Sequence, residues 1–426
     1  MTEGRVQSID CLRGITIFGM ILCAAISFGA GLPAWMFHCQ VPPPDYAFQP
    51  DVRGITWVDL VFPFFIFSLG AAIPFSLGRK LDKGASLLSV SLGIVRRWAI
   101  LVAFGLALGH SDALAKSPLA PESLSWVRFA LWAMLFAALV QTKHKWINIA
   151  GWVLTAGSFL LLHYCFSLPL ALAQNDCIII LLSTVALLGG FIWLLTRNSR
   201  RLRLVIWLLV IVTKIIGWDW AMYLVIALPA TVVGDLLREP VSGAPKHYAL
   251  CAWIALAAVP LQLWGLFTRN VWLDLIITLV LAAAFLWLTF RFREQTTQIG
   301  WMGFALLLVG IAVDPLDGGI AKDYCNLSYL FVGGGLASLV LYFLLWVESR
   351  RNLSCNLTMT GRNPMIAYTI AWTVVTPLLY AVGLLGLIDS ACVGNPLMGA
   401  LRGIVVTLAA MALTCLCTRF KIYWKS

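Results

Sequence analysis

Apolar segments of about twenty residues recur from one end of this chain to the other, and only short polar stretches separate them. An α-helix needs about 20 apolar residues to cross the hydrocarbon core of a bilayer. Hydrophobic residues make up 61% of the 426 residues and charged residues only 12%, a composition that no water-soluble domain requires. The sequence therefore predicts an all-α, polytopic transmembrane helix bundle and excludes a soluble globular protein.

Hydropathy predicts about fourteen spans, of which 202–217 and 299–313 are short enough to be re-entrant or tilted, so we expect about 12 to 14. No stretch between the spans is long enough for a separate soluble domain, so residues 1–426 are expected to form a single transmembrane domain. The predicted spans are 14–31, 57–78, 93–110, 123–140, 146–166, 178–196, 202–217, 219–237, 248–267, 271–290, 299–313, 327–347, 364–387 and 399–418.

The net charge of +11 comes from basic residues in short clusters between the apolar segments, a pattern typical of membrane topology signals. With the N-terminus placed in the cytoplasm, most of the 30 lysines and arginines fall on the cytoplasmic side of the predicted spans. Most of the 19 acidic residues fall on the outer side. Because positive residues concentrate on the cytoplasmic side of membrane proteins, we expect both termini in the cytoplasm and no nucleic-acid partner.

The longest outer loop, from about residue 32 to residue 56, leads into a span that carries the carboxylate Asp59 near its outer end. A carboxylate inside an apolar helix costs free energy unless it faces a cavity or a partner, which favours a functional role. The alternative is that Asp59 caps a helix near the lipid headgroups. Arg128, at the outer end of the fourth predicted span, either pairs with Asp59 or extends its charge toward the headgroups.

His38 lies in this outer loop, close to Trp35 and just before a run of three prolines that stiffens the chain. A neutral imidazole at this place can act as a base near pH 7, whereas an ordinary loop histidine is merely solvated. His110 and His163 also fall on the outer side, but three histidines without HxxxH or HxH spacing do not predict a metal site. No metal cofactor is therefore expected.

Two further stretches carry candidate binding residues. An outer loop rich in glycine and acids contains Asp317, Lys322 and Asp323, which are suited to bind a polyhydroxylated or cationic acceptor; the alternative is an ordinary turn. Arg362 and Asn363 open a helix from the inner side, where an arginine and free backbone N–H groups can hold a phosphate. The alternative there is a helix start that is flanked by positive charge for topology.

Five blocks of the sequence, taken together, are more informative than any of them alone. They are SIDCLRG at 8–14, GITWVDLVFPFF at 54–65, DGGIAKD at 317–323 with LSY at 327–329, NPMIAY at 363–368 and FKIYWK at 420–425. In this order they resemble the bacterial relatives of heparan-alpha-glucosaminide N-acetyltransferase, a family within the transmembrane acyltransferases. Residues 1–140 and 299–426 carry the motifs, and residues 141–298 are similar only weakly and are expected to hold variable helices.

The resemblance implies an enzyme of the bacterial inner membrane that passes an acetyl group from acetyl-CoA to an amino sugar or related glycan on the outer side. The family's proposed active histidine lies between the first two motif-bearing helices, which corresponds to His38 here. In the lysosomal branch, an asparagine eleven residues before that histidine is a second catalytic candidate, and Ser27 occupies the matching position. This departure bears on the role of the asparagine or on the identity of the acceptor.

The implied mechanism needs an inner site for the phosphates of acetyl-CoA and an outer site for the reaction. The inner candidates are Arg13, Arg96, Arg97, Arg362 and Asn363. At the outer site the loop histidine either deprotonates the acceptor amine or carries the acetyl group itself. The carboxylate of the second span orients it or holds the acceptor ammonium, and the arginine of the fourth span steadies the carbonyl or pairs with that carboxylate.

A different class of protein, a multi-span transporter of a sugar or other small solute, fits the span count as well. Under that interpretation Asp59, Arg128 and Asp235 bind a substrate or a proton in a midplane cavity. The sequence contains no inverted repeat, which favours the acyltransferase. The lipid bilayer is a partner in both cases. The sequence leaves the oligomeric state open between a monomer and a homodimer, since any lipid-facing helix can form an interface.

Overall fold

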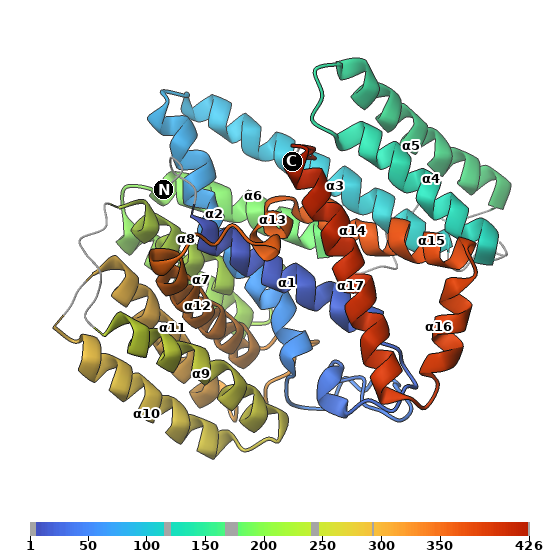
Figure 1. Ribbon diagram of the computed structural model, residues 1–426. Helices are drawn as coiled ribbons and strands as arrows, with labels where there is room; N and C mark the ends of the chain where they lie inside the picture. The colour runs from blue at the N-terminus through green and yellow to red at the C-terminus, as the bar shows by residue number, and fades with distance from the viewer. Residues whose placement is uncertain (1–5, 115–120, 167–177, 240–246, 292–293, 425–426) are drawn as a thin grey trace.

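The computed structural model describes residues 6–114, 121–166, 178–239, 247–291 and 294–424. Within these ranges every regular element is a helix, apart from one isolated antiparallel bridge between Val140 and Trp424, so the all-α prediction is confirmed (Figure 1). The helices are α1 (Gln7–Ala25), η1 (Ala34–Met36), η2 (Trp57–Leu60), α2 (Val61–Asp82), α3 (Leu87–Leu114), α4 (Pro121–Leu139), α5 (Lys145–Phe166), α6 (Ile178–Thr196), α7 (Arg200–Ile215), η3 (Asp219–Ala221), α8 (Leu224–Arg238), α9 (Tyr248–Phe267), α10 (Val271–Thr289), α11 (Gln295–Val313), α12 (Leu327–Arg350), α13 (Asn356–Arg362), α14 (Pro364–Ile370), η4 (Ala371–Val375), α15 (Thr376–Ala381), α16 (Leu384–Cys392) and α17 (Pro396–Arg419).

Twelve of the described helical segments are long and apolar enough to cross a membrane, so the chain is an integral, multi-pass membrane protein. The predicted range of about 12 to 14 spans is confirmed at its lower limit. Two predicted spans fall short, because α4 contributes only the apolar stretch Ser123–Leu139 and α7 has 16 residues. The segment 299–313, expected to be short, belongs to the 19-residue helix α11.

The predicted span 364–387 is not one continuous α-helix. It runs through α14 and the π-helical turn η4 into α15, which ends at Ala381, and Gly383 follows with a φ of 73°. A π-helical turn inserts one extra residue into a helix and occurs frequently at functional sites. The last residues of the prediction lie in the separate helix α16.

The helices α1 and α2 lie at the centre of the bundle. In Figure 1, α8 to α12 gather on one side of this pair, and α4, α5 and α15 to α17 lie on the other. The largest hydrophobic core forms where α2, α8, α11 and α12 meet, and α12 is buried along most of its length. This core holds α2 in place, and α2 forms one wall of the cavity described below.

Small residues let α2 and α8 approach each other backbone to backbone. A Cβ atom added at Gly70 of α2 would lie 2.5 Å from the carbonyl oxygen of Ala227, and one added at Gly234 of α8 would lie 2.4 Å from that of Ala71. Helices surrounded by lipid gain little from burying apolar surface against each other, so close van der Waals contact between small residues is a main source of their association.

Gly234→Leu should therefore lower the midpoint of thermal unfolding in detergent, because the new side chain collides with the backbone of Ala71 and the ring of Pro74. Overpacking of this kind costs about 1–3 kcal/mol. Gly157→Leu on α5 is the matched control, since an added Cβ at Gly157 meets no atom within 4 Å. Equal midpoints for the two variants would contradict the packing role assigned to Gly234.

Candidate functional site

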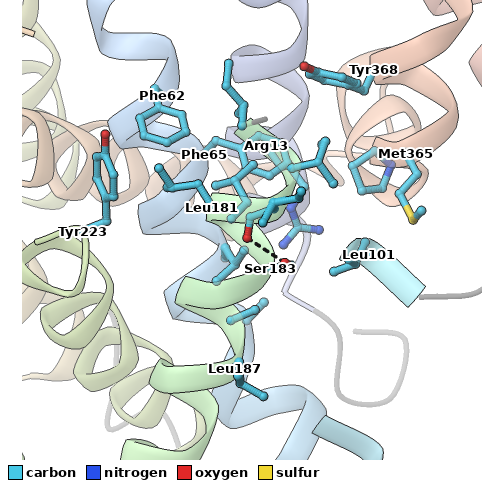
Figure 2. A pocket seen from close by; sticks show the side chains of 18 of the residues that line it. Arg13, Phe62, Phe65, Leu101, Leu181, Ser183, Leu187, Tyr223, Met365 and Tyr368 are labelled. Atoms are coloured by element: carbon cyan, nitrogen blue, oxygen red, sulfur yellow. Dashed lines mark hydrogen bonds between the residues drawn. The ribbon is translucent and has the colours of Figure 1, made fainter. Parts of the chain in front are cut away.

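A cavity of about 1110 Å³ lies between α1, α2, α3 and α6, and residues of two loops line one of its ends. Its wall follows α2 from Val61 to Lys80, a rise of about 28 Å at about 1.5 Å per residue. This length is close to the roughly 30 Å thickness of the hydrocarbon core of a bilayer, so the cavity follows most of a helix that is long enough to cross the membrane. Its middle is largely apolar, and Figure 2 shows Phe62, Phe65 and Leu181 among the side chains that line it.

His38 and Asp59 meet at the end of the cavity that the first loop closes. The Nδ1 atom of His38 lies 2.7 Å from Oδ1 of Asp59. The Asp59 side chain is completely buried, whereas 36% of the His38 side chain is exposed. Of the two, only His38 lines the cavity. The imidazole is therefore accessible from the cavity, and the carboxylate lies behind it.

Hydrogen bonds from the first loop and from the start of η2 hold the Asp59 carboxylate. Its second oxygen, Oδ2, accepts the backbone N–H of Thr56 at 2.9 Å and that of Cys39 at 3.3 Å. Thr56 and Asp59 together form a capping box at the start of η2, and the Thr56 hydroxyl donates to the Phe37 carbonyl at 2.7 Å. Asp59 thus caps a helix and contacts His38 at the same time.

The short contact with Asp59 fixes which ring nitrogen of His38 carries the hydrogen. An ionised carboxylate only accepts hydrogen bonds, so Nδ1 must be the donor. In the neutral ring the unshared electron pair then lies on Nε2. An aspartate that orients a histidine in this way is the arrangement found in hydrolase triads, where the histidine acts as a base.

A second loop, between α11 and α12, brings Lys322 to the same histidine. The Nζ atom of Lys322 lies 3.2 Å from Nδ1 of His38. The start of this loop is fixed because Arg269 binds both carboxylate oxygens of Asp314, at 3.0 and 2.8 Å. Lys322 is therefore presented by an anchored segment, far from His38 in the sequence.

Three further cations line the cavity: Arg13 from α1, Lys80 from α2 and Arg97 from α3. Lys80 lies at the end opposite His38, whereas Arg13 lies near mid-length, with its Nη2 atom 3.4 Å from the carbonyl oxygen of Ser68. Arg13, labelled in Figure 2, donates to the carbonyl of Gly361 at 3.2 Å and lies 3.5 Å from Asp10. Arginine and lysine side chains form strong, charge-assisted hydrogen bonds with phosphates. This part of the cavity, from its middle to the end near Lys80, is therefore suited to an anionic group.

Only some of the inner binding residues predicted from the sequence line the cavity. Arg13 and Arg97 line the cavity, whereas Arg96 does not, although both Arg96 and Arg97 are exposed. Arg362 is also absent from the lining, and its Nε atom lies 3.6 Å from a carboxylate oxygen of Asp10. Two of the four arginines are thus placed to meet a ligand in the cavity.

Asn363 is buried and has a structural contact. Its side-chain amide donates to the carbonyl of Ile422 at 2.8 Å, which ties the start of α14 to the C-terminal segment. Asn363 lies outside the cavity lining, although its neighbours Pro364 and Met365 belong to it. The sequence motif around residue 363 therefore contributes apolar wall rather than an amide ligand.

Only some of the outer binding residues predicted from the sequence line the cavity. Lys322 and Asp323 line the cavity. Asp317 does not, and its Oδ2 atom accepts the backbone N–H of Ser328 at 2.8 Å near the start of α12. Ser27 also lies outside the lining.

Arg128 does not pair with Asp59. Within the described part of the chain, Arg128 has no carboxylate partner, and its Nε atom is buried without a hydrogen bond. It lies on α4, which packs mainly against α5 and α15, whereas the Asp59 carboxylate is occupied by His38 and backbone N–H groups. The pairing suggested by similar depth in the sequence is therefore not formed.

Tyr329, Thr56 and Lys80 were not singled out by the sequence. The Tyr329 hydroxyl donates to the backbone carbonyl of Asp59 at 2.8 Å, and its side chain lines the cavity. Thr56 carries a sequence signal that could have been used, because a threonine three residues before an acid is a capping-box pattern. Lys80 resembled an ordinary topology determinant at the end of a span.

The cysteine next to His38 does not compete with it as a nucleophile. Burial, together with the nearby charge of Asp59, raises the pKa of the Cys39 thiol to about 12, so it stays protonated at neutral pH. Among the described residues, no group of three or more His, Cys, Asp and Glu side chains could hold a metal ion. The side chain of His110 lies outside the described part of the structure.

Comparisons with known proteins connect this chain with one family and two relatives. A family model described as "Domain of unknown function (DUF5009)" matches residues 5–221, just over half of the chain. Heparan-alpha-glucosaminide N-acetyltransferase of Mus musculus is 29% identical over 107 residues, 25% of this chain and 14% of the mouse protein. The protein of the same name from Homo sapiens is 30% identical over 104 residues, 24% of this chain and 14% of the human protein. The chain thus spans about one seventh of the length of either relative.

Thr56→Val should destabilise the protein by about 1–3 kcal/mol, because the buried Phe37 carbonyl loses its hydrogen-bond donor. Thr56→Ser is the control, since it keeps the hydroxyl and removes only a methyl group, which costs about 0.5–1.5 kcal/mol. The measurement is the thermal unfolding midpoint of both variants in detergent. A serine variant as unstable as the valine variant would show that packing, and not the hydrogen bond, holds this loop.

Proposed function

We propose that this chain, which belongs to the family described as Domain of unknown function (DUF5009), is a transmembrane acyltransferase. It moves an acetyl group from acetyl-CoA to an amino sugar or related glycan on the outer side of the bacterial inner membrane. The observation that carries the proposal is one cavity that has His38, paired with Asp59, at one end and is lined by three further cations from its middle to its other end. The distant similarity to membrane acetyltransferases supports the same class of reaction.

The shape and charge of the cavity match the two parts of acetyl-CoA. The nucleotide end of this co-substrate carries phosphates, and Arg13, Lys80 and Arg97 offer positive charge for them. The apolar middle of the cavity suits the slim arm that carries the thioester. With the phosphates at the cytoplasmic end, as the charge distribution of the sequence favours, the thioester reaches His38 near the outer face.

At the outer end, Nε2 of His38 is the group with a free electron pair. It either takes a proton from the acceptor amine while the amine attacks the thioester, or attacks the thioester and carries the acetyl group. Asp59 keeps the ring in the required tautomer through Nδ1. Incubation with labelled acetyl-CoA and no acceptor separates the routes, because stoichiometric labelling of the protein excludes simple direct transfer.

Coenzyme A at micromolar to millimolar concentration should raise the thermal unfolding midpoint of the purified protein, whereas a sugar transporter should not respond. Arg97→Met should weaken this binding about tenfold or more, because one charge-assisted hydrogen bond contributes about 1.5–3 kcal/mol. Arg96→Met is the matched control, because Arg96 neighbours Arg97 but lies outside the cavity lining.

Pantetheine, which lacks the nucleotide phosphates, provides a second control for the same measurement. Its effect should be equal in wild-type protein and in Arg97→Met. No response of the wild type to coenzyme A would contradict the proposed donor and favour the transporter. An equal loss of coenzyme A binding in Arg96→Met would contradict the assignment of Arg97 to the phosphates.

Reconstituted protein should transfer labelled acetyl from acetyl-CoA to at least one member of a panel of amino sugars, and His38→Ala should slow the transfer about 10²–10⁴-fold. The variant should still be stabilised by coenzyme A, because Arg13, Lys80 and Arg97 are unchanged. Asp59→Asn should also slow the transfer, since an amide can hold the wrong ring tautomer. Full transferase activity of His38→Ala would exclude its catalytic role.

A further inference from the structure

Two groups of opposite charge contact the same nitrogen of His38. Asp59 Oδ1 lies 2.7 Å from Nδ1, and Lys322 Nζ lies 3.2 Å from it. Nδ1 has either one hydrogen to donate or one electron pair to accept with, and not both. The shorter contact is to a carboxylate that is fully buried, so the hydrogen on Nδ1 belongs to that contact.

The Lys322 ammonium consequently cannot donate a hydrogen bond to Nδ1. Its three N–H groups must find other acceptors, and the side chain lines the cavity. Within the described residues, no carboxylate forms an ion pair with Lys322. The ammonium is therefore a cation beside the imidazole, with its hydrogen-bond donors available to a group in the cavity.

The position of Lys322 is set by its loop. Its backbone carbonyl accepts the N–H of Cys325 at 2.9 Å, and the N–H of the preceding Ala321 donates to the side-chain oxygen of Asn326 at 3.2 Å. The first loop is tied to this loop by a hydrogen bond from the Gly54 N–H to the Ile320 carbonyl at 2.8 Å. The two loops thus hold the cation and the histidine in a fixed relation.

We propose that Lys322 stabilises the oxyanion that forms when the thioester carbonyl is attacked beside His38. This inference rests on the proposed acyltransferase function and assigns a further catalytic residue to the same site. A positive group with free N–H donors, already in place before the reaction, favours a transition state in which negative charge develops on a carbonyl oxygen. The other cations that line the cavity are Arg13, Lys80 and Arg97, and among the described residues none of them contacts His38.

The step is the same in either route of transfer. The electron pair of the nucleophile, His38 Nε2 or the acceptor nitrogen, forms a bond to the carbonyl carbon, and the carbonyl π electrons move to the oxygen beside Lys322. When the oxyanion collapses, the carbonyl π bond forms again and the carbon–sulfur bond breaks. The sulfur leaves with the electron pair of the broken bond and gains a proton to become the thiol of coenzyme A. In the relay, a second attack by the amine forms a second oxyanion at the same place, and its collapse frees Nε2 and releases the amide and a proton.

The first test is a kinetic comparison in reconstituted protein. Lys322→Met should lower kcat about 10²–10³-fold, the usual effect of losing one oxyanion donor, with a KM for acetyl-CoA within a few-fold of the wild type. Lys322→Arg, which keeps the charge and the donors, should recover part of the loss. Lys83→Met, an exposed lysine outside the cavity lining, is the matched control and should behave as the wild type.

A second measurement does not depend on the donor being acetyl-CoA. Diethyl pyrocarbonate transfers an ethoxyformyl group to a neutral imidazole by attack at a carbonyl carbon, with the same development of oxyanion charge. Mass spectrometry should find His38 modified more slowly in Lys322→Met than in the wild type, with the exposed His144 as an internal reference for reagent dose. A CoA-induced thermal shift equal to that of the wild type would show that the variant keeps its cavity.

The outcomes separate the inference from the function on which it rests. If wild-type protein transfers no acetyl group to any acceptor, the proposed function fails, and the labelling of His38 still reports on Lys322. A wild-type kcat in Lys322→Met overturns the inference. Labelling of His38 in that variant as fast as or faster than in the wild type also overturns it, whereas slower labelling supports it.

Discussion

A buried carboxylate is stable inside a protein only when hydrogen bonds or an opposite charge satisfy it, and Asp59 imposes this requirement on the loops around it. The first loop supplies His38 and a backbone N–H, the start of η2 supplies another, and Tyr329 of α12 holds the Asp59 carbonyl. If the first loop moved away from η2, the Asp59 carboxylate would be left without its partners in an apolar setting. The same contacts that stabilise the carboxylate therefore give the imidazole one orientation and one tautomer.

The packing of the helix bundle creates the long cavity that begins at His38. Close contact of α2 with α8, through Gly70 and Gly234, leaves the opposite face of α2 free to line a cavity. The cavity begins near the loops and ends near Lys80, so residues near opposite ends of α2 line one continuous cavity. The transferase proposal depends on this continuity more than on any single residue.

Hydropathy was sufficient to predict the helical fold, and the cost of an ionisable group within a span identified Asp59. Proximity in space was harder to infer. Arg128 was predicted to lie at a depth similar to that of Asp59, but its helix packs elsewhere. Arg96 and Arg97 are neighbours on α3, and only Arg97 lines the cavity. Lys322 was predicted as a binding residue, but its contact with His38 joins residues 284 positions apart, which no local pattern reveals. Hydropathy also did not predict that the span 364–387 ends at Ala381, where Gly383 adopts a positive φ before α16 begins.

The length of the cavity also has an electrical consequence. If an acyl group leaves a cytoplasmic thioester and arrives at an outer amine, the source of the proton that the sulfur gains decides whether turnover is electrogenic. A proton passed inward from the amine through His38 makes the exchange electroneutral. A proton taken from the cytoplasm leaves one positive charge moved outward, at a cost of about 2.3 kcal/mol for each 100 mV of membrane potential. The imidazole at the outer end would then govern how strongly an energised membrane opposes the reaction.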